Sequence, residues 1–365
     1  MDAVIASALC AAEKEFAYRN QNSMKLISFA IPSYNSQDYL RHCVDTILTG
    51  GEDVEILIIN DGSTDNTAAI ADEYAAKYPS IVRAIHKKNG GHGSAVNRGR
   101  DEATGLYYKV VDSDDWVNAD ALKTLLDTIR THMAENKLPD LYITNFTYDH
   151  VYDHTQFVRK WHRQFPANTF CTWDDVGLFV GSQVLLMHSL MYKTQRLRES
   201  DTQLPEHTFY VDNYFAYKPL PLMRTIFYLD VDLYNYFIGR DDQSVNIKNF
   251  TKRYDQQLRV MRCMADAYTY EEIRQMQPPL RRYMLHCLSA IMLNTMMFCC
   301  SGGDEPERIA AHEELWQHIQ EQDPELYHFL VHRGMPATMK WMPWKMRGKT
   351  MLAGYQMLCK LVKLG

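Results

Sequence analysis

Short apolar runs alternate with amphipathic segments along the first third of the chain. Residues 26–31, 54–59, 81–85 and 106–111 are apolar runs that predict buried strands. After each of the first two runs, apolar residues recur at the three- and four-residue spacing of a helix, and Ser36 is the predicted N-cap of the first. A third helix is predicted over residues 94–103. This alternation predicts an α/β fold with a largely parallel, doubly wound sheet. In such a fold, ligands bind at the loops that leave the carboxyl ends of the strands.

Polar motifs lie on these loops. In chain order they read Pro32-Ser33-Tyr34-Asn35-Ser36, then Asn60-Asp61-Gly62-Ser63-Thr64-Asp65, then Asn89-Gly90-Gly91-His92-Gly93-Ser94-Ala95-Val96-Asn97-Arg98-Gly99, and then Asp112-Ser113-Asp114-Asp115-Trp116. The third motif is rich in glycine and opens a helix, so its backbone can approach a ligand closely while the helix N-terminus faces negative charge. The first loop lacks the G-x-G-x-x-G sequence of dinucleotide-binding enzymes, which argues against a dehydrogenase.

The fourth motif concentrates negative charge at the end of a strand. Asp112, Asp114 and Asp115 place three carboxylates within four positions, and like charges at this spacing repel each other unless a hard divalent cation neutralises them. Magnesium and manganese fill their open coordination positions with substrate phosphates. The sequence therefore predicts a divalent cation site here. The alternative is an Asp-rich turn in which Asp114 or Asp115 starts the helix near Ala119.

Composition narrows the class of protein. The 365 residues are 46% hydrophobic and 23% charged, which is ordinary for globular domains. The formal charge of −6 argues against a general nucleic-acid binder, because neutralising phosphates needs a basic surface. Eight cysteines without C-x-x-C pairs predict reduced thiols in a cytoplasmic protein.

Taken together, the four motifs resemble the ordered signatures of glycosyltransferase family 2, whose members have the GT-A fold. The segment 234–245, which contains Tyr234, Tyr236 and Arg240, is similar to the segment that closes the catalytic domain in many bacterial members. The resemblance implies an N-terminal extension over residues 1–23 and a GT-A catalytic domain over 24–247. Residues 248–365 then form a mainly helical C-terminal region.

The resemblance also implies roles for individual residues. Tyr34 would offer its ring to a nucleobase, Asp61 would accept a hydrogen bond from the imide N–H of uracil, and Arg240 would reach the diphosphate. Asp112 and Asp114 would hold manganese or magnesium. The full set of implied donor-binding residues is Pro32, Tyr34, Asn35, Asp61, Asn89, Gly91, Asn97, Asp112, Ser113, Asp114 and Arg240.

A catalytic base is also expected, because the acceptor hydroxyl must lose a proton as it attacks the anomeric carbon. Inverting members of the family carry an aspartate downstream of the D-x-D pair, at the start of a helix and often after a glutamate. The matching aspartate here is Asp212, although Val211 replaces the usual glutamate. Glu206 is the second candidate, and the structural alternative for Asp212 is a helix cap.

The C-terminal region raises the question of a membrane. Residues 283–303 carry no formal charge, but His286, Asn294 and other polar residues favour a buried helix over a transmembrane one. Residues 326–365 contain seven Lys or Arg and no Asp or Glu. Together with Trp341 and Trp344, this basic tail predicts either a helix that contacts anionic lipid or a docked helix with solvated charges.

The resulting functional hypothesis is a cytoplasmic, metal-dependent, inverting hexosyltransferase. It would move one sugar from a nucleotide-diphosphate donor, with UDP preferred, to an acceptor hydroxyl in cell-surface polysaccharide or glycolipid assembly. The acceptor would be a saccharide or a lipid-linked saccharide. The sequence leaves open whether the protein forms a homodimer. Because the chain lacks the Q-x-x-R-W sequence of processive synthases, single addition is preferred. The alternatives are a nucleotidyltransferase on a similar fold and a non-catalytic binding module.

Overall fold

The computed structural model describes residues 24–150, 154–239, 251–303 and 305–362. The N-terminal extension and Arg240 lie outside the described residues. The strands are β1 (Ile27–Ser33), β2 (Val54–Asn60), β3 (Val82–His86), β4 (Tyr107–Val110), β5 (Trp116–Val117), β6 (Leu141–His150), β7 (Thr155–Arg159), β8 (Phe170–Cys171), β9 (Leu190–Lys193) and β10 (Ile226–Ile238).

The helices divide into those that flank the sheet and those that follow it. The flanking α-helices are α2 (Leu40–Leu48), α3 (Thr67–Lys77), α4 (His92–Glu102), α5 (Ala119–Ala134), α6 (Thr194–Glu199) and α7 (Asp212–Tyr217). The short 3₁₀ segments are η1 (Gly51–Asp53), η2 (Trp173–Asp175), η3 (Met187–Ser189) and η4 (Leu220–Leu222). The C-terminal helices are α9 (Tyr254–Ala265), α10 (Tyr270–Gln275), α11 (Pro278–Ser301), α12 (Pro306–Gln322), α13 (Pro324–His332), α14 (Ala337–Lys340) and α15 (Trp344–Val362).

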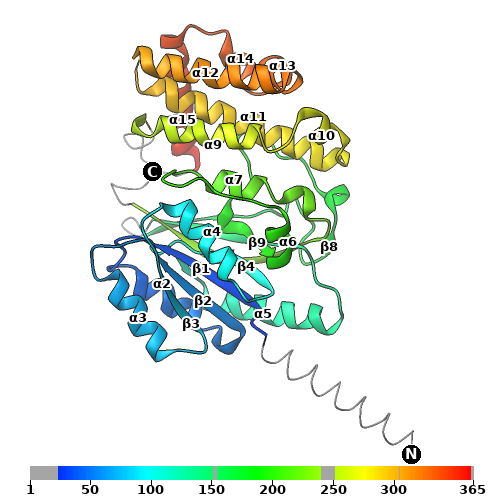
Figure 1. Ribbon diagram of the computed structural model, residues 1–365. Coiled ribbons are helices and arrows are strands. Elements are labelled where there is room, and N and C mark those ends of the chain that lie inside the picture. The colour runs from blue at the N-terminus through cyan, green and yellow to red at the C-terminus, as the bar shows by residue number, and fades with distance from the viewer. Residues whose placement is uncertain (1–23, 151–153, 240–250, 304, 363–365) are drawn as a thin grey trace, which may run out of the picture.

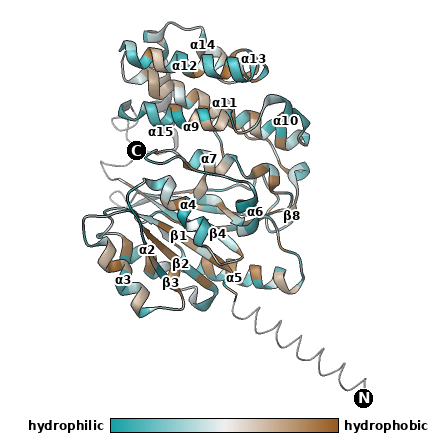
Figure 2. Ribbon diagram, viewed as in Figure 1, coloured by the Kyte–Doolittle hydropathy of each residue, from teal (hydrophilic) through white to brown (hydrophobic). Residues whose placement is uncertain are grey.

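The strands form one mixed sheet in the order β3-β2-β1-β4-β9-β6-β10-β5, with β7 paired to β6 and β8 to β10. Every residue of β1 and β2 is buried, which explains why these strands are mostly apolar, with Ser28, Ser33, Glu55 and Asn60 as their buried polar residues. Helices α2, α3 and α5 contact one another or the strands beneath them, and α4 and α6 form a second group that packs on β1, β2, β4 and β9 (Figures 1 and 2). The predicted α/β architecture is therefore confirmed.

The expectation of a largely parallel sheet is wrong, because five of the nine strand pairings in the described part of the chain are antiparallel: β4–β9, β9–β6, β6–β7, β10–β8 and β10–β5. The strands from β3 to β4 are parallel, as are β6 and β10, but β9 runs antiparallel to both of its neighbours, β4 and β6. The physical reason is that β9 is reached through the irregular segment after β8 rather than through a helical crossover. Strand β9 separates the parallel group β3-β2-β1-β4 from the parallel pair β6 and β10.

The C-terminal helices form a layer beside α7, with α11 at its centre (Figure 1). Helix α11 is long and apolar enough to cross a membrane, but 72% of its most apolar part is buried within the protein. Its Tyr283 hydroxyl accepts a hydrogen bond from the backbone of Leu185, so the helix packs on the α/β part. The prediction of a buried helix is confirmed by this packing.

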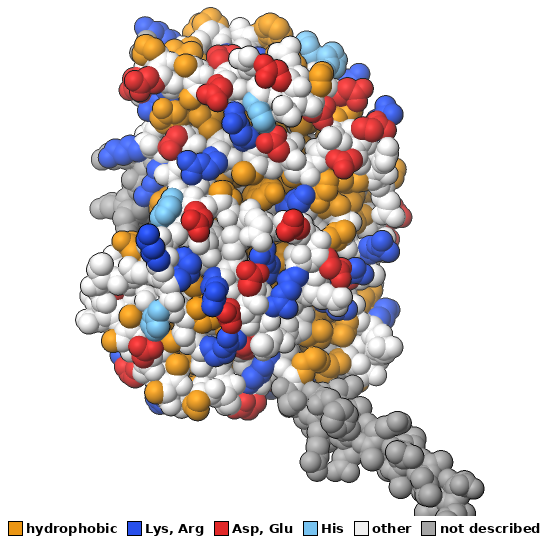
Figure 3. All heavy atoms as spheres, viewed as in Figure 1, with side chains coloured by type: hydrophobic (Ala, Val, Ile, Leu, Met, Phe, Trp, Pro, Cys, Tyr) orange, Lys and Arg blue, Asp and Glu red, His pale blue; other side chains and the backbone are white. Residues whose placement is uncertain are grey.

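Acidic and basic side chains are interspersed on the face seen in Figure 3. That mixture agrees with a chain whose formal charge of −6 is small for its 365 residues.

A close contact between α4 and β1 leads to a prediction about stability. A Cβ atom on Gly99 would lie 2.6 Å from the Ala30 Cβ and 2.9 Å from the Tyr108 hydroxyl oxygen. We expect Gly99→Ala to lower the free energy of unfolding by roughly 1–3 kcal/mol, because the helix must move away from the sheet. Urea unfolding followed by circular dichroism measures the change.

The matched control is Gly354→Ala in α15, where nothing lies within 4 Å of the added Cβ. There the gain in helix propensity acts alone, and we expect a neutral or stabilising effect of up to about 1 kcal/mol. Equal effects of the two substitutions would contradict the tight packing of α4 on β1.

Candidate active site

The four polar loops meet at the carboxyl edge of β1, β2 and β4. The Asp61 N–H donates to the Ser33 carbonyl at 2.9 Å. The hydroxyls of Ser36 and Ser113 are 2.7 Å apart, which joins the first loop to the carboxylate loop. The predicted convergence of the motifs is therefore confirmed. Ser36 is not the side-chain cap of α2, because this bond occupies its hydroxyl and the helix begins only at Leu40.

Tyr34 and Asn35 lie at the rim of this edge. Tyr34 is 54% exposed, so its ring is not part of the core. Asn35 has a φ of 49°, and its side-chain carbonyl accepts the Thr64 N–H at 2.9 Å, which ties the first loop to the second. Pro32 is buried in β1, one residue before the strand ends. An exposed ring above a rigid loop suits a stacking surface for a planar ligand.

Asp61 is engaged by the glycine-rich loop. Its carboxylate accepts the N–H groups of Gly90 at 3.0 Å and Gly91 at 2.7 Å, and Lys87 Nζ lies 2.5 Å away. The Asn89 side chain donates to the Asp61 carbonyl at 2.8 Å. In this structure Asp61 therefore fixes the loop, and a contact of Asp61 with a nucleobase stays a prediction.

Asp112 lies between two histidines. Its Oδ1 is 2.7 Å from His92 Nε2, and its Oδ2 is 4.0 Å from His188 Nε2. Burial raises the pKa of Asp112, but the charge and hydrogen bond of His92 outweigh burial and bring the pKa below its usual value. Asp112 is thus held as a carboxylate at the strand end.

His188 was not identified from the sequence, because it comes from η3, far from any motif. Burial lowers the pKa of His188 to about 4, so the ring is neutral, and its Nδ1 is buried without a hydrogen-bond partner among the described residues. The Lys109 ammonium donates to the His188 carbonyl at 2.7 Å, and burial lowers the pKa of Lys109 to about 7. The buried Lys109 thus holds the backbone of His188, whose ring faces Asp112.

Asp115 has a structural role. Its carboxylate accepts hydrogen bonds from the Tyr234 hydroxyl and from the Phe237 N–H, the latter at 2.8 Å, and burial raises its pKa well above the usual value. These bonds join the carboxylate loop to β10. The alternative in which Asp114 or Asp115 starts the next helix is wrong, because the side chain of Asn118 caps α5 by accepting the Ala121 N–H.

Two sets of side chains could hold a cation. Asp112, Asp115 and His188 place ligand atoms within 4.8 Å of one another, but both Asp115 oxygens already accept hydrogen bonds. Asp112 and Asp114 offer carboxylate oxygens, the ligands that magnesium and manganese prefer. Asp114 is half-buried and lines a cavity of about 600 Å³. The chemistry of these two carboxylates suits a divalent cation, although Asp114 does not belong to the group whose ligand atoms lie within 4.8 Å of one another.

Asp212 is the first residue of α7 and lies near the same carboxylates. Burial raises the pKa of Asp212 to about 6; the Asp112 charge adds to this rise, and His92 opposes it. The charges of Asp112, Asp212 and Asp114 raise the pKa of His92 against the effect of burial, and of these three carboxylates that of Asp112 is hydrogen-bonded to the ring. The predicted base and the predicted metal ligands are thus electrostatically linked through His92.

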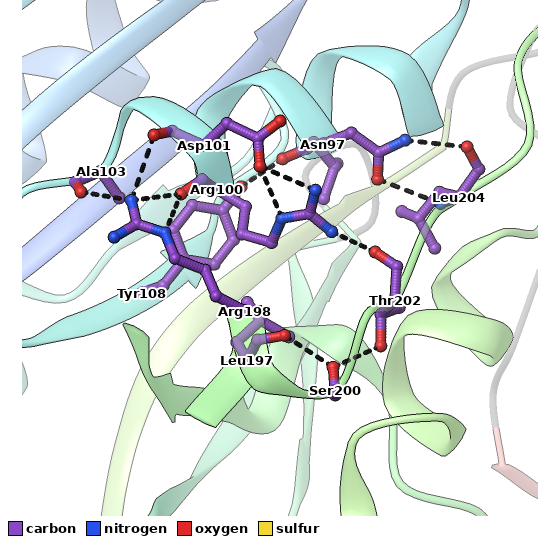
Figure 4. A network of polar contacts seen from close by, with 11 residues as sticks. Asn97, Arg100, Asp101, Ala103, Tyr108, Leu197, Arg198, Ser200, Thr202 and Leu204 are labelled. Carbon is purple, nitrogen blue, oxygen red and sulfur yellow. Dashed lines mark hydrogen bonds and ion pairs between the residues drawn. The ribbon is translucent and has the colours of Figure 1, made fainter. Parts of the chain in front are cut away.

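A strap of residues 200–211 leads to Asp212 and is fastened along α4. The Asn97 amide donates to the Leu204 carbonyl at 2.9 Å and accepts the Leu204 N–H at 3.0 Å, while Arg100 donates to the Thr202 carbonyl (Figure 4). Asn97 therefore positions the strap.

Two further hydrogen bonds join the strap to residues at the start of α4 and in the loop before it. The Ser94 hydroxyl donates to Glu206 at 3.0 Å, and the His207 N–H donates to the Gly90 carbonyl at 2.7 Å. Gly91 has a φ of 83°, and a Cβ there would lie 2.9 Å from the His207 nitrogen. The glycine-rich loop and the strap are thus held against each other, and this contact requires glycine.

Comparisons with known proteins agree with this geometry. Residues 28–194 match the model of the family described as "Glycosyl transferase family 2". The chain is 28% identical over 232 residues to glycosyltransferase GlyA of Streptococcus pneumoniae, an alignment that covers 60% of this chain and 31% of that protein. It is 43% identical over 118 residues to the uncharacterized glycosyltransferase YibD of Escherichia coli, covering 32% and 33%. The chain therefore spans about a third of the length of these relatives.

Among solved structures, the chain is similar to Staphylococcus aureus TarS 1–349, crystallised in complex with UDP-GlcNAc. The TM-score is 0.61 with 19% sequence identity, and the match covers 92% of each chain. At that identity the likeness establishes the fold alone.

Proposed function

We propose, from the match of residues 28–194 to the model of glycosyltransferase family 2, that this chain belongs to that family and transfers a single sugar to an acceptor hydroxyl. The donor is a nucleotide-diphosphate sugar, and the reaction inverts the anomeric centre. A UDP-sugar is the first donor to test, because the structurally similar TarS was crystallised with UDP-GlcNAc. The acceptor is a saccharide or a lipid-linked saccharide of the cell surface.

One observation carries this proposal. The His92 imidazole lies 2.7 Å from the Asp112 carboxylate at the edge where the motif loops meet, and the charges of Asp112, Asp212 and Asp114 raise its pKa against the effect of burial. A nucleotidyltransferase or a non-catalytic module would not need a carboxylate with a raised pKa beside the donor-binding loops. The arrangement thus favours transfer to a hydroxyl.

The proposed residues act on the two groups that change in the reaction, which are the departing nucleoside diphosphate and the attacking acceptor hydroxyl. A divalent cation held by Asp112 and Asp114 supplies positive charge that stabilises the departing diphosphate. Tyr34 and the glycine-rich loop hold the nucleotide, and the His92 bond keeps the Asp112 carboxylate oriented. Asp212 removes the proton from the acceptor hydroxyl as that oxygen attacks the anomeric carbon.

The experiment that tests the proposal is a product assay. The protein is incubated with UDP-sugars and manganese or magnesium, and release of UDP is compared with release of pyrophosphate from UTP and a sugar phosphate. UDP release that requires the cation supports transfer. Pyrophosphate release would favour a nucleotidyltransferase, and no turnover of any donor would favour a binding module.

The raised pKa of Asp212 predicts the pH dependence of the reaction. Because a base must be ionised to accept a proton, kcat/KM should fall about tenfold per pH unit below a midpoint near 6. The measurement is initial-rate UDP formation at saturating cation across that midpoint. A profile that stays flat through pH 6 would contradict the assignment of Asp212.

The basic tail supports a peripheral position on the cytoplasmic side of a membrane. Trp341 is 72% exposed, and Lys345, Met346 and Lys349 are exposed in the segment that follows it, although Arg347 and Gly348 between them are buried. We expect the protein to float with vesicles that contain anionic phosphatidylglycerol and to remain unbound with phosphatidylcholine alone. Each basic residue near such a surface adds about 1 kcal/mol, so Lys345→Glu with Lys349→Glu should weaken binding at least about tenfold.

Lys123→Glu on the exposed face of α5 is the control for these charge reversals. Equal loss of flotation with the control would indicate a general charge effect and not a lipid-binding tail. Absence of flotation by the unaltered protein would remove the membrane proposal while leaving the transfer reaction untouched.

A further inference from the structure

The strap is bound not only by α4 but also by α9, the first helix of the C-terminal layer. Helix α9 packs against α7, the helix that begins with Asp212 (Figure 1). Both helices come after residue 194, where the match to the family model ends. The family match therefore does not extend to α9 or to its contacts with the strap.

Two side chains of α9 form hydrogen bonds with neighbouring residues of the strap. The Gln256 side-chain carbonyl accepts the Phe209 N–H at 2.8 Å. The Arg259 guanidinium donates to the Thr208 hydroxyl at 2.9 Å, and that buried hydroxyl donates in turn to the Glu206 carbonyl at 2.8 Å. Because Gln256 and Arg259 are three positions apart on a helix, they lie on one face of α9, and this face is directed at the strap.

Aromatic contacts add to these hydrogen bonds. The guanidinium carbon of Arg253, at the N-terminal end of α9, lies 3.8 Å from the centroid of the Phe209 ring. The Tyr210 ring packs edge-on against Phe298 of α11, with the two ring centroids 4.9 Å apart. Three consecutive residues of the strap, 208–210, therefore contact the C-terminal layer.

The backbone of this part of the strap has an unusual conformation. His207 has a φ of 47° and Tyr210 a φ of 65°, which is the left-handed region that residues other than glycine rarely adopt. Each such residue costs about 1–3 kcal/mol and persists where the surrounding structure fixes it. The hydrogen bonds from α9 reach the two residues between them, Thr208 and Phe209, so they stabilise this turn.

The turn is connected directly to the start of α7. The Tyr210 carbonyl accepts the Asn213 N–H at 3.3 Å and the Asn213 side-chain amide at 3.1 Å. The Val211 carbonyl accepts the Phe215 N–H at 2.9 Å. These bonds tie the first turn of α7 to the strap, so a displacement of the strap would also displace the carboxylate of Asp212.

We propose that α9 positions Asp212 for proton removal, with Gln256 and Arg259 as positioning residues that act through the strap. The inference rests on the proposed transfer reaction, in which Asp212 is the base, and it extends the machinery of that reaction to the C-terminal region. Because a misplacement of about 1 Å can lower a rate about 10²-fold, a helix outside the α/β part can control the reaction in this way.

The test removes each hydrogen bond from α9 separately. Gln256→Ala removes the acceptor of the Phe209 N–H, and Arg259→Ala removes the donor to Thr208. We expect each change to lower kcat by about tenfold or more, whereas the donor Kd from calorimetry should change less than about threefold. Gln256→Glu keeps a side-chain oxygen at the same position and should restore most of the lost kcat.

Two variants in the same helical layer are the controls. Arg262→Ala removes an ion pair between α9 and Glu314 of α12, and Gln317→Ala removes a hydrogen bond to Glu321 within α12. Neither of these bonds involves the strap, and both variants should keep kcat. The proposal is overturned if Gln256→Ala and Arg259→Ala keep kcat, if Gln256→Glu fails to restore it, or if the controls lose it equally.

Hydrogen exchange tests the contact between α9 and the strap without any need for turnover. Exchange of the amides in residues 205–214 is followed by mass spectrometry in the unaltered protein, Gln256→Ala and Arg262→Ala. We expect exchange about tenfold faster or more in Gln256→Ala and unchanged exchange in Arg262→Ala. Unchanged exchange in Gln256→Ala would overturn the proposal. If the unaltered protein turned over no donor, the transfer reaction and the role of Asp212 in it would be overturned, whereas faster exchange in Gln256→Ala would still support the hold of α9 on the strap.

Discussion

Asp212→Asn is expected to abolish most of the sugar transfer while leaving donor binding intact. The amide keeps the size and position of the side chain at the start of α7 but cannot accept a proton from the acceptor hydroxyl. General bases contribute about 10²–10⁴ to a rate, so kcat should fall about 10³-fold. The donor Kd, measured by calorimetry with the cation present, should change less than about threefold.

Glu206→Gln is the comparison for this substitution, because Glu206 was the second candidate for the base. Its carboxylate accepts the Ser94 hydroxyl at 3.0 Å, which marks it as part of the strap. We expect a smaller effect of this change on kcat. If Glu206→Gln were the more damaging of the two, or if Asp212→Asn lost donor affinity, the base assignment would be wrong.

Asp114→Ala is expected to remove both donor hydrolysis and transfer. A cation that neutralises a departing diphosphate contributes several kcal/mol, and losing one of its two carboxylate ligands should lower kcat/KM by about 10³-fold. The apparent cation affinity, obtained by manganese titration of the rate, should fall with it. Because Asp114 is half-buried rather than in the core, the far-ultraviolet circular dichroism should be unchanged.

Asp120→Ala provides the control for Asp114→Ala, because Asp120 is exposed in the first turn of α5, a few residues along the chain. It should leave both rate and cation affinity unchanged. An Asp114→Ala protein that keeps cation-dependent turnover would exclude Asp114 from the metal site and would turn attention to the group formed by Asp112, Asp115 and His188.

The convergence of the motif loops could be predicted because it depends on local pattern and on a general property of parallel sheets. Each of the first strands ends in its own polar motif, and parallel strands present their carboxyl ends at one edge. The place of Asp212 at the start of a helix near the carboxylates also followed from the family resemblance. These features require no knowledge of contacts between distant segments.

The hydrogen-bond partners of these residues could not be predicted, because they come from segments that are distant in the sequence. Asp115 is bound by the hydroxyl of Tyr234, which lies 119 positions away, and Asp112 faces His188 across 76 positions. Nothing in the local sequence of η3 distinguishes His188 from an ordinary core histidine. Likewise, the amide of Asn97 lies in a family motif, but its bonds to Leu204 depend on the path of the strap.

The mutual hold between α4 and the strap has a consequence for protein engineering. Gly91, Asn97 and Arg100 join the glycine-rich loop and α4 to the strap that leads to the candidate base. The two segments therefore depend on each other's sequence for their packing and hydrogen bonds. A chimera with a related transferase should therefore take residues 89–212 from a single parent. A crossover point inside that interval would combine the glycine-rich loop of one parent with the strap of the other, and the contacts between them would not match.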